Sequence, residues 1–274
     1  MGKGGWMDET RERLAEFLQS CGKHKAAWRL KNCGTGYIAL RCRACGEVSR
    51  VRFTCNVRIC GECVRRQSKE ALKKILAVLL YLDRMRSFRR GWTWKLLTVT
   101  TRSEGSERWR VGLVKREFHN LWHRYYGRER GAGCFYAVEI GEGGNVHLHA
   151  VMYAPYRERD ELKRYWERRT GAYIVDIRMV RFGLHHVAAY VVKYMMKEAE
   201  GDVERLVENY MAMVGRRRIG AKGIFYNVKV VEEKRSICAF CLKWAGWVVV
   251  LPFRLLLECG VPILTRVIWR VEFG

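Results

Sequence analysis

The stretch CFYAVEIGEGGNVHLHAVMY, residues 134–153, decides how the rest of the sequence is interpreted. Two apolar runs flank a glycine-rich segment at residues 141–144, a pattern that is typical of two strands joined by a turn. Side chains two residues apart on a strand point to the same face. We therefore expect His147 and His149 to present their imidazoles side by side.

The first of these strands carries Glu139. An odd-length loop or a bulge at the glycine turn would place Glu139 opposite His147. Two imidazoles and one carboxylate suit a divalent cation and leave coordination positions open, as catalytic rather than structural metal sites do. The sequence predicts that His147, His149 and Glu139 bind Mg²⁺ or Mn²⁺, and it does not choose between the two ions.

The segments around this hairpin alternate between strand and helix patterns. A strand is expected at residues 96–101 (LLTVTT) and another at residues 172–180. Apolar residues at helical spacing predict helices over residues 106–126, 157–169 and 184–200, and a further helix and a basic strand after Asp202. This order predicts an α+β domain with a mainly antiparallel sheet flanked by helices.

The helix expected over residues 184–200 contains the segment AAYVVKYMMKE. Tyr190 and Tyr194 are four residues apart and share one helical face, and Lys193 and Lys197 each follow a tyrosine by three residues. Taken alone, this pattern favours a helix with two core aromatics and two solvated lysines over a pair of nucleophiles.

Cysteines are concentrated near the N-terminus, mostly in CxxC pairs. Cys42 with Cys45 and Cys60 with Cys63 form two such pairs, and four thiolates arranged in this way can hold one tetrahedral zinc ion. We expect this zinc-ribbon-like module to bind structural Zn²⁺. A second zinc site is possible at Cys21, His24, Cys33 and Cys55, and the alternative is that these four residues are buried or free.

The chain has 52 Lys and Arg residues against 28 Asp and Glu residues, so its formal charge is +24. This excess makes a polyanion, and nucleic acid above all, the expected partner. The first residues lack the apolar core of a secretory signal, which together with the CxxC pairs predicts a cytoplasmic protein. The apolar run at residues 244–257 is too short and too interrupted for a membrane span. Scarce Asn and Gln beside abundant Arg are in keeping with a thermophilic source.

The strand LLTVTT, then HLH, then YVVKYMMK resemble in order and spacing the three motifs of the HUH endonucleases, in particular the rolling-circle replication initiators (Rep proteins) of plasmids and viruses. The arginine-bearing segment CNVRICGECVRR, residues 55–66, is similar to the cysteine segment that precedes the endonuclease domain in many such initiators, with Gly61 in place of their usual proline. GRRRIGAKG resembles their basic strand. The resemblance covers roughly residues 33–226.

The resemblance implies an HUH domain of ferredoxin-like fold and a metal-dependent DNA endonuclease and strand transferase. Its third motif identifies Tyr194 as the first nucleophile and Tyr190 as a second one, with Lys197 or Lys193 neutralising phosphate or phenolate charge. The reaction would nick single-stranded origin DNA and leave a 5′-phosphotyrosine and a 3′-hydroxyl for a polymerase. Unwinding would require a separate helicase, since the sequence contains no Walker motif.

We expect three regions: an N-terminal helix and zinc module at residues 1–86, an HUH domain at 87–232 and an apolar tail of unknown role at 233–274. Two other functions stay open. One is a transposase of the same superfamily, and the other is a non-catalytic zinc-ribbon regulator that binds DNA. The origin sequence and the oligomeric state are not indicated.

Overall fold

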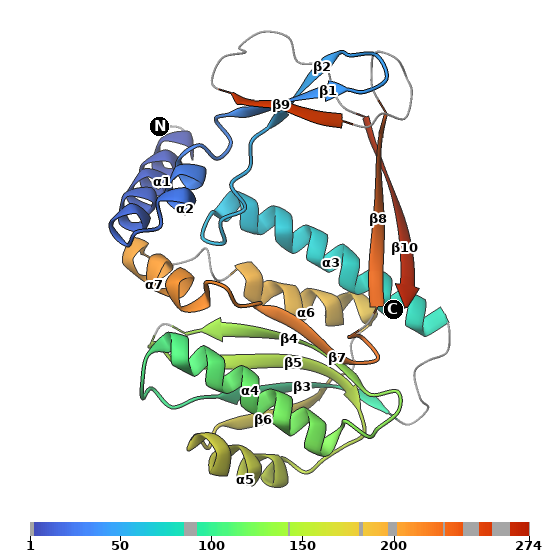
Figure 1. The fold of residues 1–274 in the computed structure, drawn as a ribbon. Helices are drawn as coiled ribbons and strands as arrows, with labels where there is room; N and C mark the ends of the chain where they lie inside the picture. The colour runs from blue at the N-terminus through green and yellow to red at the C-terminus, as the bar shows by residue number, and fades with distance from the viewer. Residues whose placement is uncertain are drawn as a thin grey trace. The chain divides into compact units, whose positions relative to one another are not determined.

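A computed structural model describes residues 3–84, 92–141, 143–180, 183–196, 202–226, 228–237, 247–253 and 264–273 (Figure 1). The chain divides into two compact units. The first consists of Met1–Cys63 and Val230–Glu272, and the second of Val64–Lys229 with Phe273–Gly274. The long helix α3 (Gly61–Arg84) begins in the first unit and continues into the second.

The second unit is built on a five-stranded sheet with the strand order β6-β3-β5-β4-β7. All neighbouring strands are antiparallel. The strands are β3 (Thr93–Thr100), β4 (Gly133–Ile140), β5 (Val146–Ala154), β6 (Val175–Val180) and β7 (Ile219–Gly223). The α+β class and the mainly antiparallel sheet predicted from the sequence are therefore confirmed.

Helices cover both faces of this sheet (Figure 1). α4 (Glu107–Tyr125) and α5 (Arg159–Thr170) pack on one face, and α6 (Leu184–Met196) lies against β4 and β5 on the other. α7 (Val203–Met213) packs against α4. The face under α4 and α5 holds the apolar core, which includes Leu97, Val99, Leu148, Ala150, Met152, Phe118, Leu121 and Trp166.

Strand alternation explains why the two faces of the sheet differ in polarity. On β3 and β5 the residues that alternate with the core side chains point to the α6 face, and they include the polar residues Thr98, Thr100, His147 and His149. Register also decides the position of Glu139, which pairs directly with His147 across the β4–β5 hairpin. The hairpin connection of residues 141–145 has the odd length that this register requires, and Gly144 provides the positive φ of +75° in its turn.

The described part of the first unit includes two helices that precede α3 and two small sheets. α1 (Lys3–Ser20) packs on α2 (His24–Lys31), and Leu14, Leu18 and Leu30 of this pair are buried. A three-stranded sheet has the order β2-β1-β9, with β1 (Tyr37–Cys42), β2 (Val48–Arg52) and β9 (Trp247–Phe253). β8 (Val228–Ile237) pairs with β10 (Leu264–Phe273).

Neither α2 nor the β1–β2 hairpin is evident from the sequence, because cysteines, glycines and arginines interrupt the apolar periodicity there. The sequence also does not indicate that the C-terminal region supplies β9, a partner for β1. Among the helices of the described residues, none combines the length and the apolar character that a membrane span requires.

Candidate active site and zinc cluster

His147 and His149 lie on the same face of β5, with their ring centroids 6.0 Å apart. Each imidazole contacts a threonine of β3. The hydroxyl oxygen of Thr98 is 3.1 Å from Nδ1 of His149, and that of Thr100 is 2.9 Å from Nδ1 of His147. Both contacts engage Nδ1, so Nε2 is the ring nitrogen that would bind a cation.

The two threonines were not predicted as site residues. Their positions follow from the register, which pairs Thr98 with His149 and Thr100 with His147. Histidines that bind metals commonly donate the other ring N–H to an outer group that fixes the tautomer and the ring orientation. A hydroxyl that accepts the Nδ1 hydrogen would keep Nε2 unprotonated and able to bind a cation.

Glu139 supplies the oxygen donor of the site. Its Oε2 lies 2.8 Å from Nε2 of His149, and the residue is only 9% exposed. We expect from the sequence that His147, His149 and Glu139 share one face. In the structure Glu139 contacts His149 and pairs in register with His147, whose ring centroid lies 6.0 Å from that of His149. Two imidazole nitrogens and a carboxylate oxygen are suitable ligands for Mn²⁺ or Mg²⁺, so a divalent cation fits these residues.

Helix α6 brings two tyrosines to the same face of the sheet. The ring of Tyr194 stacks on the imidazole of His149, with centroids 3.9 Å apart and planes 7° from parallel. The hydroxyl of Tyr194 donates a hydrogen bond of 3.0 Å to the hydroxyl of Tyr190. Tyr194 is 5% exposed and Tyr190 is less buried, so the two phenols form a connected pair next to the histidines.

The environment of Tyr194 disfavours its phenolate. Burial raises the pKa of Tyr194 well above its ordinary value, and the hydrogen bond with Tyr190 and the nearby Glu139 carboxylate raise it further. A cation does lie close: the ammonium of Lys193 is 4.2 Å from the ring centroid of Tyr190 and 4.8 Å from that of Tyr194. Lys197, the other lysine of the motif, lies outside the described residues.

Four buried cysteines form a cluster in the first unit: Cys33, Cys55, Cys60 and Cys63. Their sulfur atoms all lie within 4.8 Å of one another, and three of the Sγ···Sγ distances are 3.5 to 3.6 Å. Four thiolates at about 2.3 Å from a tetrahedral zinc ion are separated by roughly 3.8 Å. The cluster therefore has the ligands and nearly the dimensions of a closed structural zinc site.

Hydrogen bonds favour the thiolate of Cys60 in this cluster, whereas the pKa values of Cys33 and Cys55 are raised. The backbone N–H groups of Cys55 and Val57 lie 3.4 Å from the sulfurs of Cys33 and Cys55, respectively. A hydrogen bond from Cys55 lowers the pKa of Cys60 to about 5, whereas burial raises the pKa of Cys33 to about 11. At least one thiol of the four is thus prepared to ionise before the others.

The ligand sets predicted from the sequence are corrected by this cluster. It combines Cys60 and Cys63 of the predicted first site with Cys33 and Cys55, which the sequence analysis assigns to a possible second site. Four predicted ligands lie outside the cluster: Cys21, His24, Cys42 and Cys45. Cys21, His24 and Cys45 are exposed, and Cys42 is buried at the end of β1.

The β1–β2 hairpin is the physical reason for this different set. Its backbone hydrogen bonds between Gly34 and Phe53 close the open end, and this brings Cys33 near Cys55. Cys42 ends β1 at the tip of the same hairpin, five residues from Tyr37, and Cys45 lies in the turn that follows. At about 3.3 Å per residue the tip is roughly 16 Å away from the open end, too far for shared coordination of one ion.

Two segments of the chain match protein-family models. Residues 94–199 match the model described as replication-associated protein ORF2/G2P, and residues 7–86 match the transposase zinc-binding domain. The first segment contains the three proposed metal ligands and both tyrosines, and the second contains the four clustered cysteines. Neither a curated protein nor a solved structure matches the chain significantly. The two matches confirm the resemblance to a Rep-like HUH protein with an N-terminal zinc module.

Proposed function

We propose that this Rep-like chain is an HUH endonuclease that nicks single-stranded DNA at a replication origin and initiates rolling-circle replication. The proposal depends above all on one observation, the stacking of Tyr194 on His149, which lies 2.8 Å from Glu139. This contact supports the proposal, because it joins a tyrosine of α6 to a proposed cation ligand of β5. The polyanion expected from the charge of +24 agrees with a DNA substrate.

In the proposed reaction the Oη atom of Tyr194 attacks the phosphorus of the scissile phosphodiester. A bond forms between Oη and phosphorus, the bond between phosphorus and O3′ breaks, and the phenol proton ends, through solvent or neighbouring groups, on the released O3′. A divalent cation held by His147, His149 and Glu139 would polarise the phosphate and stabilise its negative charge. The products are a 5′-phosphotyrosine and a 3′-hydroxyl that can prime a polymerase.

The second tyrosine and the lysines have supporting roles in this proposal. Tyr190 accepts the hydrogen bond of Tyr194, so it can stabilise the developing phenolate only after it has itself turned to donate. It would also serve as the nucleophile for a second transesterification. Lys193, whose ammonium lies over both rings, would neutralise phenolate or phosphate charge. Lys197 keeps the same proposed role on the basis of the motif alone.

The test is formation of a covalent adduct. The full chain is incubated with a fluorescent single-stranded oligonucleotide from the origin and Mn²⁺, and adducts are separated under denaturing conditions. The His147→Ala/His149→Ala double variant should lose the adduct while its affinity for the oligonucleotide stays within about twofold of the unaltered chain. An adduct of unchanged yield in that variant would rule out the proposed metal site.

A transposase of the same superfamily is the second candidate, and the match of residues 7–86 to a transposase zinc-binding domain favours it. Both functions share the nicking step. They differ in the acceptor: an initiator rejoins the ends of its own origin strand, whereas a transposase joins the nicked end to a target strand. Supplying both acceptors in one assay distinguishes them, and DNA binding without any adduct would instead support a non-catalytic regulator.

A further inference from the structure

Two of the three proposed cation ligands lie close to the end of a hairpin. Glu139 and His147 are paired across β4 and β5. Only one further pair, Ile140 with Val146, lies between them and the turn at residues 141–145. Strand ends beside turns open more readily than strand centres do. Something must hold this turn if the ligands are to stay in position without a bound cation.

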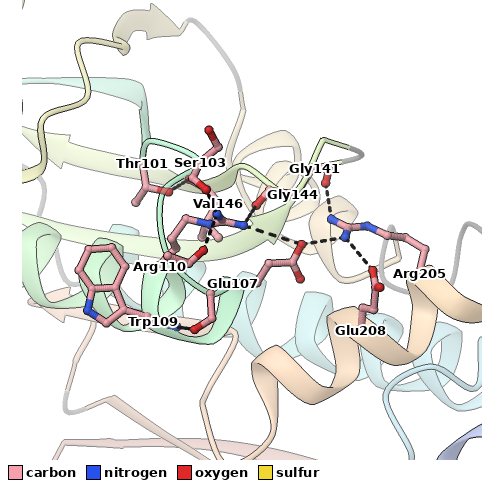
Figure 2. A network of polar contacts seen from close by, with 12 residues as sticks. Thr101, Ser103, Glu107, Trp109, Arg110, Gly141, Gly144, Val146, Arg205 and Glu208 are labelled. Atoms are coloured by element: carbon pink, nitrogen blue, oxygen red, sulfur yellow. Dashed lines mark hydrogen bonds and ion pairs between the residues drawn. The ribbon is translucent and has the colours of Figure 1, made fainter.

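Arg110 of α4 binds the turn from one side (Figure 2). Its guanidinium donates to the carbonyl of Gly144 at 2.9 Å, to that of Gly105 at 2.9 Å and to that of Ser103. The Arg110 side chain is 7% exposed, and Gly144 is itself buried, so the carbonyl of Gly144 depends on this hydrogen bond. Arg110 thereby ties the hairpin turn to the loop between β3 and α4.

Arg205 of α7 binds the same turn from the other side (Figure 2). It donates to the carbonyl of Gly141 at 2.7 Å and to the Glu107 carboxylate at 2.7 Å, and it also contacts Glu208 at 3.1 Å. The same Oε1 atom of Glu107 lies 4.0 Å from Arg110. Glu107 therefore stands between the two guanidinium groups that hold the two ends of the turn.

The turn borders directly on a ligand atom. A Cβ atom added to Gly141 would lie 3.2 Å from Nε2 of His147, which shows how closely the backbone at Gly141 approaches the nitrogen proposed to bind the cation. A displacement of Gly141 would therefore alter the surroundings of that nitrogen. The carbonyl of this glycine is the group that Arg205 holds.

We infer that Arg205 is a positioning residue: together with Glu107 it fixes the turn at residues 141–145, and so keeps Glu139 and His147 arranged for a divalent cation before the cation arrives. This inference rests on the proposed function, because it requires a cation at these ligands. It assigns a role to α7, the helix that follows the tyrosine helix in the sequence. Arg205 would act through the backbone and without touching DNA or metal.

The test measures Mn²⁺ binding directly, by calorimetric titration of the DNA-free chain. Arg205→Gln removes the charge and the paired hydrogen bonds to Gly141 and Glu107. We expect it to raise the Kd for Mn²⁺ roughly tenfold, because mutating groups that hydrogen-bond to metal ligands lowers metal affinity about 10- to 100-fold. Nicking by this variant should recover at saturating Mn²⁺, with the Kd for the oligonucleotide unchanged. Arg205→Lys should behave similarly, since one ammonium cannot reproduce the fork of a guanidinium.

Arg157→Gln is the matched control. Arg157 also pairs with a carboxylate, Glu129, at 2.8 Å and contacts the backbone carbonyl of Tyr125, and it follows the opposite end of β5 from His147. We expect its Mn²⁺ affinity to equal that of the unaltered chain. Hydrogen exchange provides a second measurement, in which the amides of residues 140–146 exchange faster in Arg205→Gln and slow again when Mn²⁺ is added.

Three results would overturn the inference. If Arg205→Gln and Glu107→Gln lower the melting temperature but leave the Kd for Mn²⁺ and the exchange of the turn unchanged, the network only stabilises the fold. If the unaltered chain binds no Mn²⁺, the proposed function fails together with the inference. Normal Mn²⁺ binding and nicking by the unaltered chain, with no effect of either variant, would contradict the inference alone.

Discussion

Thr98 on β3 holds His149 on β5 through a contact of 3.1 Å between its hydroxyl and Nδ1 of the imidazole. Thr100 makes the equivalent contact of 2.9 Å with His147. The two strands are neighbours in the sheet, and the threonines pair in register with the histidines that they contact. The motif LLTVTT thus has a physical role beyond building a strand: it orients both imidazoles.

Replacing Thr98 and Thr100 by valine should weaken cation binding. Valine keeps the shape and the strand propensity but cannot accept the Nδ1 hydrogen, so the imidazoles lose their fixed tautomer. We expect a 10- to 100-fold rise in the Kd for Mn²⁺, measured by calorimetry. Thr93→Val is the control on the same strand, because Thr93 contacts Lys95 and neither histidine. Equal affinities in all these variants would deny the threonines this role.

The two tyrosines should respond differently to removal of the hydroxyl. Tyr194→Phe is expected to abolish the first covalent adduct, since its ring is the one that stacks on His149. Tyr190→Phe should retain an adduct and lose the second strand transfer. Gel separation of adducts and mass spectrometry of the linked peptide measure both effects. An adduct that maps to Tyr190 in the unaltered chain would reverse the order proposed for them.

The cysteine cluster should lose its zinc when one ligand is replaced. Cys33→Ser leaves three thiolates and is expected to lower both the zinc content and the melting temperature, because structural zinc contributes directly to folding. Cys21→Ser should change neither, since Cys21 is exposed and lies outside the cluster. Zinc is counted by elemental analysis of the purified chains. Retention of zinc in Cys33→Ser would indicate another ligand set.

Acid should destabilise the second unit partly through Glu117. This carboxylate is buried, which opposes its ionisation, but hydrogen bonds from Arg169, Arg116 and Asn120 outweigh burial and lower its pKa. A group with a lowered folded-state pKa stabilises the fold above its unfolded pKa, about 4.3, and this stabilisation is lost as the pH falls through the folded value. Glu117→Gln should therefore unfold more easily at pH 7 and show a flatter acid dependence.

Chemical denaturation at several pH values measures this difference. Glu104→Gln is the control, since its carboxylate is 77% exposed and pairs only at 3.5 Å. Exposed pairs of this kind contribute about 0 to 1 kcal/mol, so its unfolding curve should match that of the unaltered chain. If the free energy of unfolding changes with pH in the same way in the unaltered chain and in Glu117→Gln, other carboxylates govern acid unfolding.

The main features of the candidate site could be predicted from local patterns. Strand alternation places His147 and His149 on one face of a strand, and helical periodicity places Tyr190 and Tyr194 on one face of a helix. The odd length of the hairpin connection places Glu139 beside the histidines, as the register confirms. These relations follow from backbone geometry within one strand, one helix or one hairpin.

Other features depend on residues far apart in the sequence, and there the patterns were insufficient. The zinc ligands were divided wrongly because spacing alone favours the two CxxC pairs, whereas the β1–β2 hairpin separates Cys42 and Cys45 from the other cysteines. Likewise, nothing in the sequence indicates that Arg205 contacts Gly141, which is 64 residues away.

By itself, then, the sequence determined the α+β class, the pairing of two histidines with one carboxylate, and the pair of tyrosines on one helix. Each of these follows from the spacing of residues along one strand, hairpin or helix, because the geometry of these elements decides which side chains share a face. Only the tertiary structure decided that Tyr194 stacks on His149, that Thr98 fixes the imidazole, and which four cysteines meet. Those contacts depend on how strands are ordered and where helices cross them, and no local period encodes that order.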